Sequence, residues 1–288
     1  MRILAKNLKY VYSEKSKSLA FTALKNVNIS IEEGEFFGII GKTGSGKSTF
    51  IQHLNGLITA QSNGGTLMVG EYDLTNKKCD FNTLRSKIGM VFQYPEHQLF
   101  AETVEQDVAY ALKNFRNDLS EEEIKRKVKT ALELVGLDYE SVKDKSPFDL
   151  SGGQKRRVAI AGVLVYEPEV LVLDEPVAGL DPKGKKDFIS LLKKVHQTFV
   201  KTIIIVSHDM DLICENCSSL ALFLNGEVLK QGTPKEIFLD EELIKKAELD
   251  LPLTAKLTLK LKEKGIEVSS NLKIEDFISA YATIRGIE

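Results

Sequence analysis

The sequence predicts an α/β protein built on a mixed, mostly parallel sheet. Short apolar runs suited to strands buried on both faces alternate with stretches of helical period over residues 170–224. Alternation of this kind is typical of a mostly parallel sheet. An earlier apolar run, 36–40, leads into a glycine-rich loop and then into a helix-compatible segment, 48–54. With 288 residues, 28% charged and 43% hydrophobic, the chain is long enough for one compact domain and an appendage.

The residues before the glycine-rich loop follow a period of two, which predicts antiparallel strands with one covered face. The alternating residues are Leu8, Tyr10 and Tyr12, and then Val27, Ile29 and Ile31. We therefore expect an antiparallel β subdomain ahead of the buried strand at 36–40.

The period becomes helical between residues 103 and 165, which predicts a helical subdomain inserted in the α/β core. Ser120 can cap a helix, with Glu123 at the capping-box position. A further helix follows Leu150 and carries Val158 on its apolar face.

Strand-like runs return at 170–173, 203–206 and 220–224, and Asn225-Gly226 marks a hairpin turn. From residue 235 the composition shifts to charged helix formers. One apolar stripe there consists of Leu253, Leu257 and Leu261, and a second of Phe277, Ile278, Tyr281 and Ile284. We expect a nucleotide-binding domain at 1–234 and a small helical appendage at 235–288.

Composition excludes several classes of protein. Lys and Arg sum to 39 against 41 Asp and Glu, a net charge of −2, so the basic excess of a nucleic-acid-binding protein is missing and no nucleic acid partner is expected. Aliphatic runs stop at four residues, far short of a membrane span. Charge at Lys6 and Lys9 breaks any signal-peptide core, and the chain is expected in the cytoplasm. Cys214 and Cys217 have CxxC spacing, but zinc needs four ligands, and two half-buried residues on a helix are the favoured interpretation.

The glycine-rich loop fits the pattern GxxxxGK[ST] in full and lies between a buried strand and a helix. Glycines let the backbone wrap a phosphate closely, and the N–H groups of the loop and of the helix N-terminus supply positive potential. Lys47 is expected to reach the β- and γ-phosphates, and the Ser48 hydroxyl to ligate Mg²⁺. The predicted nucleotide-binding residues here are Gly41, Lys42, Thr43, Gly44, Ser45, Gly46, Lys47, Ser48 and Thr49.

Two adjacent carboxylates end the apolar run at 170–173, at the edge where α/β sheets hold their ligands. Asp174 fits a partner of Mg²⁺, and Glu175 fits a base that orients and polarises an attacking water. A helix-capping Asp-Glu pair on a loop is the alternative interpretation of these two residues.

A second anion site is predicted at Ser151, Gly152, Gly153 and Gln154, because Ser-Gly-Gly at a helix start exposes hydroxyl and N–H groups. A fold with one phosphate loop already has a site for its own phosphate, so a second anion site indicates a different function. At this point the first 230 residues resemble an ABC-type ATPase. The motifs occur in that family's order: phosphate loop, Gln93 after a strand, Ser151–Gln154, Asp174-Glu175, Asp181 and His208.

The resemblance implies that two such chains stack head to tail, with each ATP between the phosphate loop of one and the Ser151–Gln154 segment of the other. It also implies that Gln93 senses Mg²⁺ and the attacking water, that His208 contacts the γ-phosphate, and that Asp181 couples the two sites. An aromatic residue near position 10 should stack on the base, and the family pattern favours Tyr12. The guanine-specific NKxD pattern is absent from this sequence, so ATP is the expected nucleotide.

The segment 92–100 is similar to that of the ATPase subunits of energy-coupling factor transporters, which import vitamins or transition-metal ions. That resemblance implies a related or identical ATPase partner, a transmembrane scaffold subunit and a substrate-binding membrane subunit. It places the chain peripherally at the cytoplasmic face of the cell membrane, with the appendage aiding dimerisation and the acidic segment 96–105 meeting arginines of the scaffold.

Two alternatives remain at this stage: an ATPase subunit of another ABC importer, and a soluble ABC ATPase acting on DNA or the ribosome. Chromosome-type members carry long coiled coils between phosphate loop and signature, whereas this chain has room for a helical subdomain only. Translation-type members hold two cassettes in one chain, and this chain has one.

Overall fold

The computed structural model describes residues 1–13, 20–61 and 64–285, which fall into two compact units. We call residues 2–79 and 204–288 the phosphate-loop unit, and Met1 with residues 80–203 the signature unit. The boundary between the units passes through strand β8 (Thr202–Val206). The predicted α/β class, with a mixed sheet, an antiparallel β part and a helical part, is confirmed.

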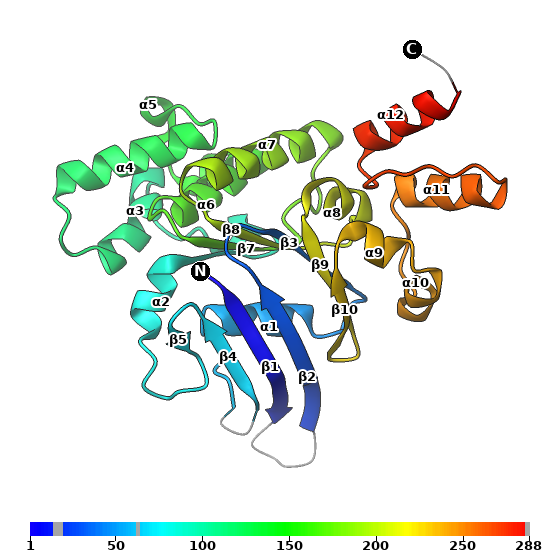
Figure 1. The fold of residues 1–288 in the computed structure, drawn as a ribbon. Coiled ribbons are helices and arrows are strands. Elements are labelled where there is room, and N and C mark those ends of the chain that lie inside the picture. Colours follow the sequence, from blue (N-terminus) through cyan, green and yellow to red (C-terminus); the bar gives the residue numbers. More distant parts are fainter. Residues whose placement is uncertain (14–19, 62–63, 286–288) are drawn as a thin grey trace. The chain divides into compact units, whose positions relative to one another are not determined.

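The phosphate-loop unit contains a mixed sheet with the strand order β5-β4-β1-β2-β10-β9-β3 (Figure 1). Its antiparallel part comprises β1 (Ile3–Ser13), β2 (Ala20–Ile31), β4 (Thr66–Val69) and β5 (Tyr72–Asp73). The expected alternation is present in β2, where Val27, Ile29 and Ile31 are buried. β3 (Phe36–Gly41) is buried along its whole length and pairs in parallel with β9 (Ser219–Leu224). β10 (Glu227–Gly232) returns antiparallel to β9.

Short helices complete this unit: α1 (Lys47–Leu54), α8 (Met210–Asn216), α9 (Pro234–Phe238), α10 (Glu241–Ala247), α11 (Leu253–Glu263) and α12 (Ile274–Arg285). Helix α1 packs its apolar face on the sheet, with the Phe50 ring 5.6 Å from that of Phe223. The phosphate loop is therefore held between a fully buried strand and a helix anchored in the core.

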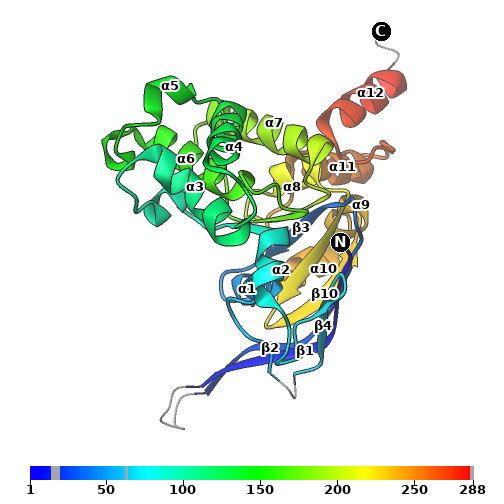
Figure 2. The ribbon, with the colours of Figure 1, turned by 90° about the vertical axis from the view of Figure 1, so that its left-hand side faces the viewer.

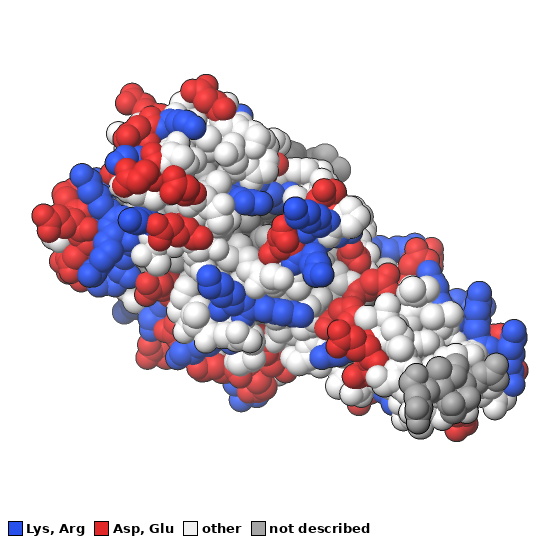
Figure 3. Space-filling view, turned by 90° about the horizontal axis from the view of Figure 1, so that it is seen from above, with Lys and Arg blue, Asp and Glu red and all other residues white. Residues whose placement is uncertain are grey.

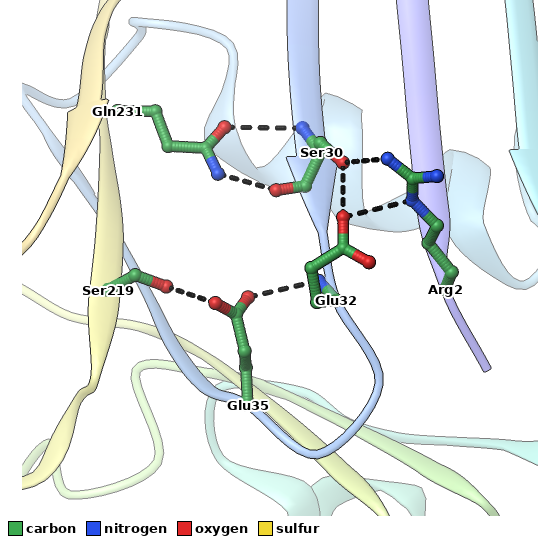
Figure 4. A network of polar contacts seen from close by, with 6 residues as sticks. All are labelled: Arg2, Ser30, Glu32, Glu35, Ser219 and Gln231. Atoms are coloured by element: carbon green, nitrogen blue, oxygen red, sulfur yellow. Dashed lines mark hydrogen bonds and ion pairs between the residues drawn. The ribbon is translucent and has the colours of Figure 1, made fainter.

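A polar network joins four strands at one end of this sheet (Figure 4). Among the described residues, the parallel pairing of β2 with β10 lies at Asn26 and Glu227. Further along, the Gln231 amide takes over, because it accepts from the Ser30 N–H and donates to the Ser30 carbonyl. The Ser30 hydroxyl also accepts from Arg2 (3.1 Å) and donates to Glu32 (3.0 Å). The Gln231 side-chain amide thus forms the two hydrogen bonds that a backbone peptide group of a paired strand would form.

The signature unit holds the parallel pair β6 (Ile88–Val91) and β7 (Val170–Asp174) together with a group of helices, coloured from cyan to yellow-green in Figure 2. The helices are α2 (Phe81–Lys87), α3 (Val104–Phe115), α4 (Glu121–Leu134), α5 (Tyr139–Val142), α6 (Gly152–Leu164) and α7 (Pro182–Thr198), with 3₁₀ turns η1 (Pro95–Gln98) and η2 (Pro147–Asp149). The capping box expected at Ser120 and Glu123 starts α4.

The apolar stripes predicted for the last two helices are only partly buried: Phe277 is buried, whereas Leu253, Leu257 and Ile278 are exposed. Helix α11 instead buries Thr254, Ala255 and Thr258, and the Thr254 hydroxyl donates to the Leu272 carbonyl. Exposed apolar side chains remain on both helices, a set that we call the C-terminal apolar surface: Leu253, Leu257, Ile274, Ile278 and Ile284. In the view of Figure 3, by contrast, basic and acidic side chains are interspersed over much of the face, in keeping with the small net charge.

Candidate functional site

The phosphate loop follows β3 directly, and its lysine is held in place before any nucleotide arrives. Lys47 is buried, and its ammonium donates to the carbonyls of Gly41 (2.7 Å) and Lys42 (2.9 Å). A loop that folds around its own cation is already curved, as a phosphate cradle requires. A phosphate binding here would take over the Lys47 hydrogen bonds.

Helix α1 begins without a side-chain cap, because its N-cap residue is Gly46. A helix start without a side-chain cap favours an anion at that end. Gly46 has φ +104°, and a Cβ there would come within 2.8 Å of the Ala23 carbonyl. At Gly44 (φ +80°) a Cβ would meet nothing within 4 Å, so this part of the loop faces open space. The Ser45 hydroxyl, which is buried, has no hydrogen-bond partner in the structure.

The hairpin turn at Asn225-Gly226 supports the loop from behind, a role that the sequence did not reveal. The Gly226 N–H donates to the Ser45 carbonyl (3.0 Å), and the Gly226 carbonyl accepts from Lys25 (2.8 Å). Lys42 is ion-paired with Glu248, which ends α10 in a left-handed conformation (φ 51°). The loop is thus connected to the β9–β10 turn and to the C-terminal helices.

Tyr12 and His208 lie on elements next to the phosphate loop. The Tyr12 hydroxyl is 3.4 Å from the Thr49 hydroxyl in the first turn of α1, and the Tyr12 ring meets that of Tyr10 edge to face at 4.9 Å. The two tyrosines therefore share a face of β1, as expected. The Ser207 N–H donates to the Ile39 carbonyl of β3 (3.3 Å), so the exposed His208 leaves its strand beside the strand that carries the loop.

In the signature unit, Gln93 and the pair Asp174-Glu175 lie at or just after the ends of two neighbouring strands, whereas Ser48, which the sequence also predicts for Mg²⁺, belongs to the phosphate-loop unit. Strands β6 and β7 are parallel, with Val91 opposite Leu173. Asp174 ends β7, and Gln93 lies two residues beyond β6, so both follow strands that end at the same edge. Asp174 and Glu175 are half-buried, and Glu175 has φ +47°, where the chain turns sharply away from the strand.

The predicted second anion site begins helix α6 and faces solvent. Ser151, Gly152 and Gly153 are exposed, and a Cβ on either glycine would meet nothing within 4 Å. Ser151 and Gln154 form a capping box, in which the Ser151 hydroxyl accepts from the Gln154 N–H (3.4 Å). The Ser151 hydroxyl therefore caps its own helix, and the N–H groups of Gly152 and Gly153 are the donors that would face an anion.

Asp181 is exposed and caps α7, accepting from the Gly184 N–H at 2.7 Å. Between Glu175 and Asp181 the chain makes two turns closed by Ala178 N–H to Glu175 O (3.1 Å) and Leu180 N–H to Val177 O (3.1 Å). A compact loop, which we call the Glu175–Asp181 loop, thus joins the predicted base to the predicted coupling residue.

Cys214 and Cys217 are fully buried, not half-buried as expected from sequence. Burial raises the pKa of the Cys214 thiol to about 12 and that of Cys217 further still, so neither is a thiolate at neutral pH. Across the described ranges, no group of three or more His, Cys, Asp or Glu side chains is placed to hold a metal ion. No described helix is both long and apolar enough to cross a membrane.

Comparison with known proteins agrees with this arrangement of motifs. The family model described as "ABC transporter" matches residues 24–178. A relative from Clostridium perfringens, the energy-coupling factor transporter ATP-binding protein EcfA2, is 47% identical over 94% of each chain, and its counterpart from Clostridioides difficile is 46% identical over 94% of this chain and 93% of that one.

Solved structures are similar as well. The structure of cbiO1 from Clostridium perfringens, part of the ABC transporter complex cbiONQ, is 40% identical with a TM-score of 0.70, covering 88% of this chain and 97% of that one. A dimeric ATP-binding cassette in a post-hydrolysis state with ADP and Pi is 32% identical with a TM-score of 0.69, covering 80% and 97%. The chain therefore belongs to the ABC transporter family of ATPases, among the energy-coupling factor transporter ATP-binding proteins.

Proposed function

We propose that this chain binds ATP with Mg²⁺, pairs with a second ABC ATPase subunit, and uses hydrolysis to power uptake of a vitamin or a transition-metal ion through membrane partner subunits. The observation that carries the proposal is the preformed phosphate loop, whose lysine is held in the cradle and whose helix begins uncapped. Tyr12 is proposed to stack on the base, which is supported by its hydroxyl lying 3.4 Å from that of Thr49 in the first turn of α1.

The residues proposed for Mg²⁺ are Ser48, Asp174 and Gln93. Their hydroxyl, carboxylate and amide oxygens are the hard donors that this ion takes, and the short donor set leaves places for water and phosphate oxygens. Asp174 and Gln93 follow strands that end at one edge of the signature unit, which supports their joint role. When bound, the ion supplies positive charge against the phosphate oxygens.

Hydrolysis is proposed to proceed by in-line attack of water on the γ-phosphate. Glu175 accepts hydrogen bonding from the water and orients it, Lys47 contacts the β- and γ-phosphates, and His208 contacts the γ-phosphate. Positioned charge of this kind supplies most of the rate enhancement in phosphoryl transfer. The sharp turn at Glu175 (φ +47°) supports this role, because it directs the chain away from the strand directly after the Asp174 carboxylate.

Head-to-tail pairing of two chains is supported by the exposed start of α6. Ser151, Gly152, Gly153 and Gln154 are proposed to contact the ATP held by the partner's phosphate loop, with Asp181 coupling the two sites. The appendage at 235–288 is proposed to aid dimerisation, and the exposed apolar side chains of α11 and α12 support this proposal, because they are available for burial against a partner.

Membrane partners are proposed to dock on the segment that follows Gln93, at the cytoplasmic face of the membrane. Phe100 and Tyr110 are 60% and 54% exposed, and their rings meet edge to face at 4.8 Å. Exposed Glu102 lies next to them in sequence, whereas Glu105 is bonded to the Tyr139 hydroxyl. An aromatic patch with a nearby carboxylate suits a scaffold helix that carries arginine.

The test is the variant Glu175→Gln in the chain assembled with its membrane subunits. We expect kcat to fall by about 10²–10⁴-fold, while ATP-dependent dimerisation, followed by size-exclusion chromatography, survives. Near-normal hydrolysis by Glu175→Gln would remove Glu175 as the base. Recovery of the native chain in a soluble fraction without a hydrophobic partner would contradict the transport role.

A further inference from the structure

Arg156 is a buried arginine two positions after the predicted anion site at Ser151–Gln154. Only 7% of its surface is exposed. Its guanidinium donates to the Ala178 carbonyl (3.0 Å) and to the Pro176 carbonyl, both in the Glu175–Asp181 loop. One side chain of helix α6 therefore holds the backbone on both sides of Val177, immediately after the proposed base.

Helices α6 and α7 do not pack tightly against each other next to Arg156. Beside Arg156 the two helices border a groove of about 540 Å³, which Ile160 and Phe188 help to line. The guanidinium fork, with donors fixed in one plane, is suited to two carbonyls at once. We take these hydrogen bonds as the main connection between the start of α6 and the Glu175–Asp181 loop.

A third segment reaches the same arginine. Burial lowers the pKa of the Arg156 guanidinium, and the attraction of the Glu96 carboxylate, with a contribution from Tyr94, opposes that change. The Arg156 Nε and the Glu96 Oε2 are both buried without a hydrogen-bond partner. Leaving a charged donor and a charged acceptor buried and unsatisfied is costly, so both groups favour positions near an opposite charge.

Glu96 belongs to η1, three residues after Gln93 and four residues before the exposed Phe100. The electrostatic field at Arg156 therefore depends on the position of η1.

We propose that Arg156 is a positioning residue for hydrolysis, which holds the Glu175–Asp181 loop on the signature helix and is biased by Glu96 from the segment after Gln93. The inference rests on the proposed function of Glu175 as the base. Through Arg156, a contact at η1 alters the orientation of that base without touching the phosphate loop.

The experiment compares Arg156→Gln, Arg156→Lys, Glu96→Gln and the double variant Arg156→Gln/Glu96→Gln in the full chain assembled with its membrane subunits. Arg126→Gln, an exposed arginine on α4, is the matched control. We expect Arg156→Gln to lower kcat about 10- to 100-fold, as small misplacements of reacting groups do, with KM for ATP changed less than about 2-fold. Arg156→Lys should be intermediate, since an ammonium replaces the charge but not the fork.

Hydrogen exchange on the same chains gives a readout independent of activity. The Ala178 N–H, bonded to the Glu175 carbonyl, should exchange faster in Arg156→Gln and at the native rate in Arg126→Gln. The double variant should match Arg156→Gln alone in kcat, because Glu96 acts through the arginine.

Any one of four results would overturn the inference. They are a native kcat in Arg156→Gln, a KM that rises in step with the loss of kcat, a native exchange rate at Ala178, and additive effects in the double variant. If Arg156→Gln does not fold, Glu96→Gln tests the proposal, because this variant leaves the hydrogen bonds from Arg156 to both carbonyls in place. An unchanged kcat in Glu96→Gln would refute the proposed influence of Glu96 on Arg156. A native complex that hydrolyses no ATP contradicts the proposed function, while the exchange comparison still tests the contact itself.

Discussion

Replacing Gly226 with alanine tests how the β9–β10 turn supports the phosphate loop. Gly226 has φ +83°, a region that costs an L-residue about 1–2 kcal/mol. The added Cβ would lie 2.8 Å from the Ala23 carbonyl and 3.2 Å from the Lys25 nitrogen. We expect the hydrogen bonds to Ser45 and Lys25 to break, each contributing about 1 kcal/mol.

The sum is a loss of about 3–4 kcal/mol, or about 6–16 °C in the midpoint of thermal unfolding for a chain of this size. Gly34→Ala is the matched control, because Gly34 also has positive φ (+94°) but a Cβ there would meet nothing within 4 Å. It should cost only the backbone penalty, about 1–2 kcal/mol.

The assay is calorimetry of both variants, followed by titration with ADP. Gly226→Ala should also weaken ADP binding, since the Ser45 carbonyl loses its support, whereas Gly34→Ala should bind ADP like the native chain. Equal midpoints for the two variants would refute the reasoning, because the hydrogen bonds and the close contacts would then contribute nothing.

Three further outcomes are expected. At pH 8 a thiol reagent should label Cys79 in the native state but Cys214 and Cys217 only after unfolding, because burial raises the pKa of both buried thiols. Unfolding by urea should become easier as the pH rises above the ordinary thiol pKa, since the thiols then ionise more readily in the unfolded chain. Rapid labelling of all three thiols in the native state would contradict this prediction. Gln231→Glu should lower the free energy of unfolding by about 1–3 kcal/mol in urea titrations, because a carboxylate cannot donate a hydrogen bond to the Ser30 carbonyl. An equal loss in Gln231→Asn would instead show that the length of the side chain decides the effect. Ser120→Ala should remove the capping box of α4 and cost about 1 kcal/mol, whereas Ser120→Asp should retain most of the native stability.

Much of the architecture could be predicted because local patterns and tertiary structure agree. The alternation Val27, Ile29, Ile31 identifies a buried strand face, and the capping box at Ser120 identifies a helix start. The phosphate loop could be predicted for the same reason, since glycine, lysine and serine at those spacings serve one geometry.

The rest depends on contacts between distant segments, which carry no local signal. The stripe Leu253, Leu257, Leu261 predicts a helix but not what covers it, and α11 buries Thr254 because that hydroxyl finds the Leu272 carbonyl. Arg156 occupies a position where a charged residue is usually solvated. Its burial follows from the two carbonyls that the Glu175–Asp181 loop presents, and only the folded chain shows them.

The C-terminal apolar surface also has a consequence for the life of the subunit in the cell. A copy made in excess of its companions keeps Leu253, Leu257 and Ile278 in water, where chaperones and proteases recognise such side chains. Side chains left in water in this way would give a surplus copy an added route to degradation.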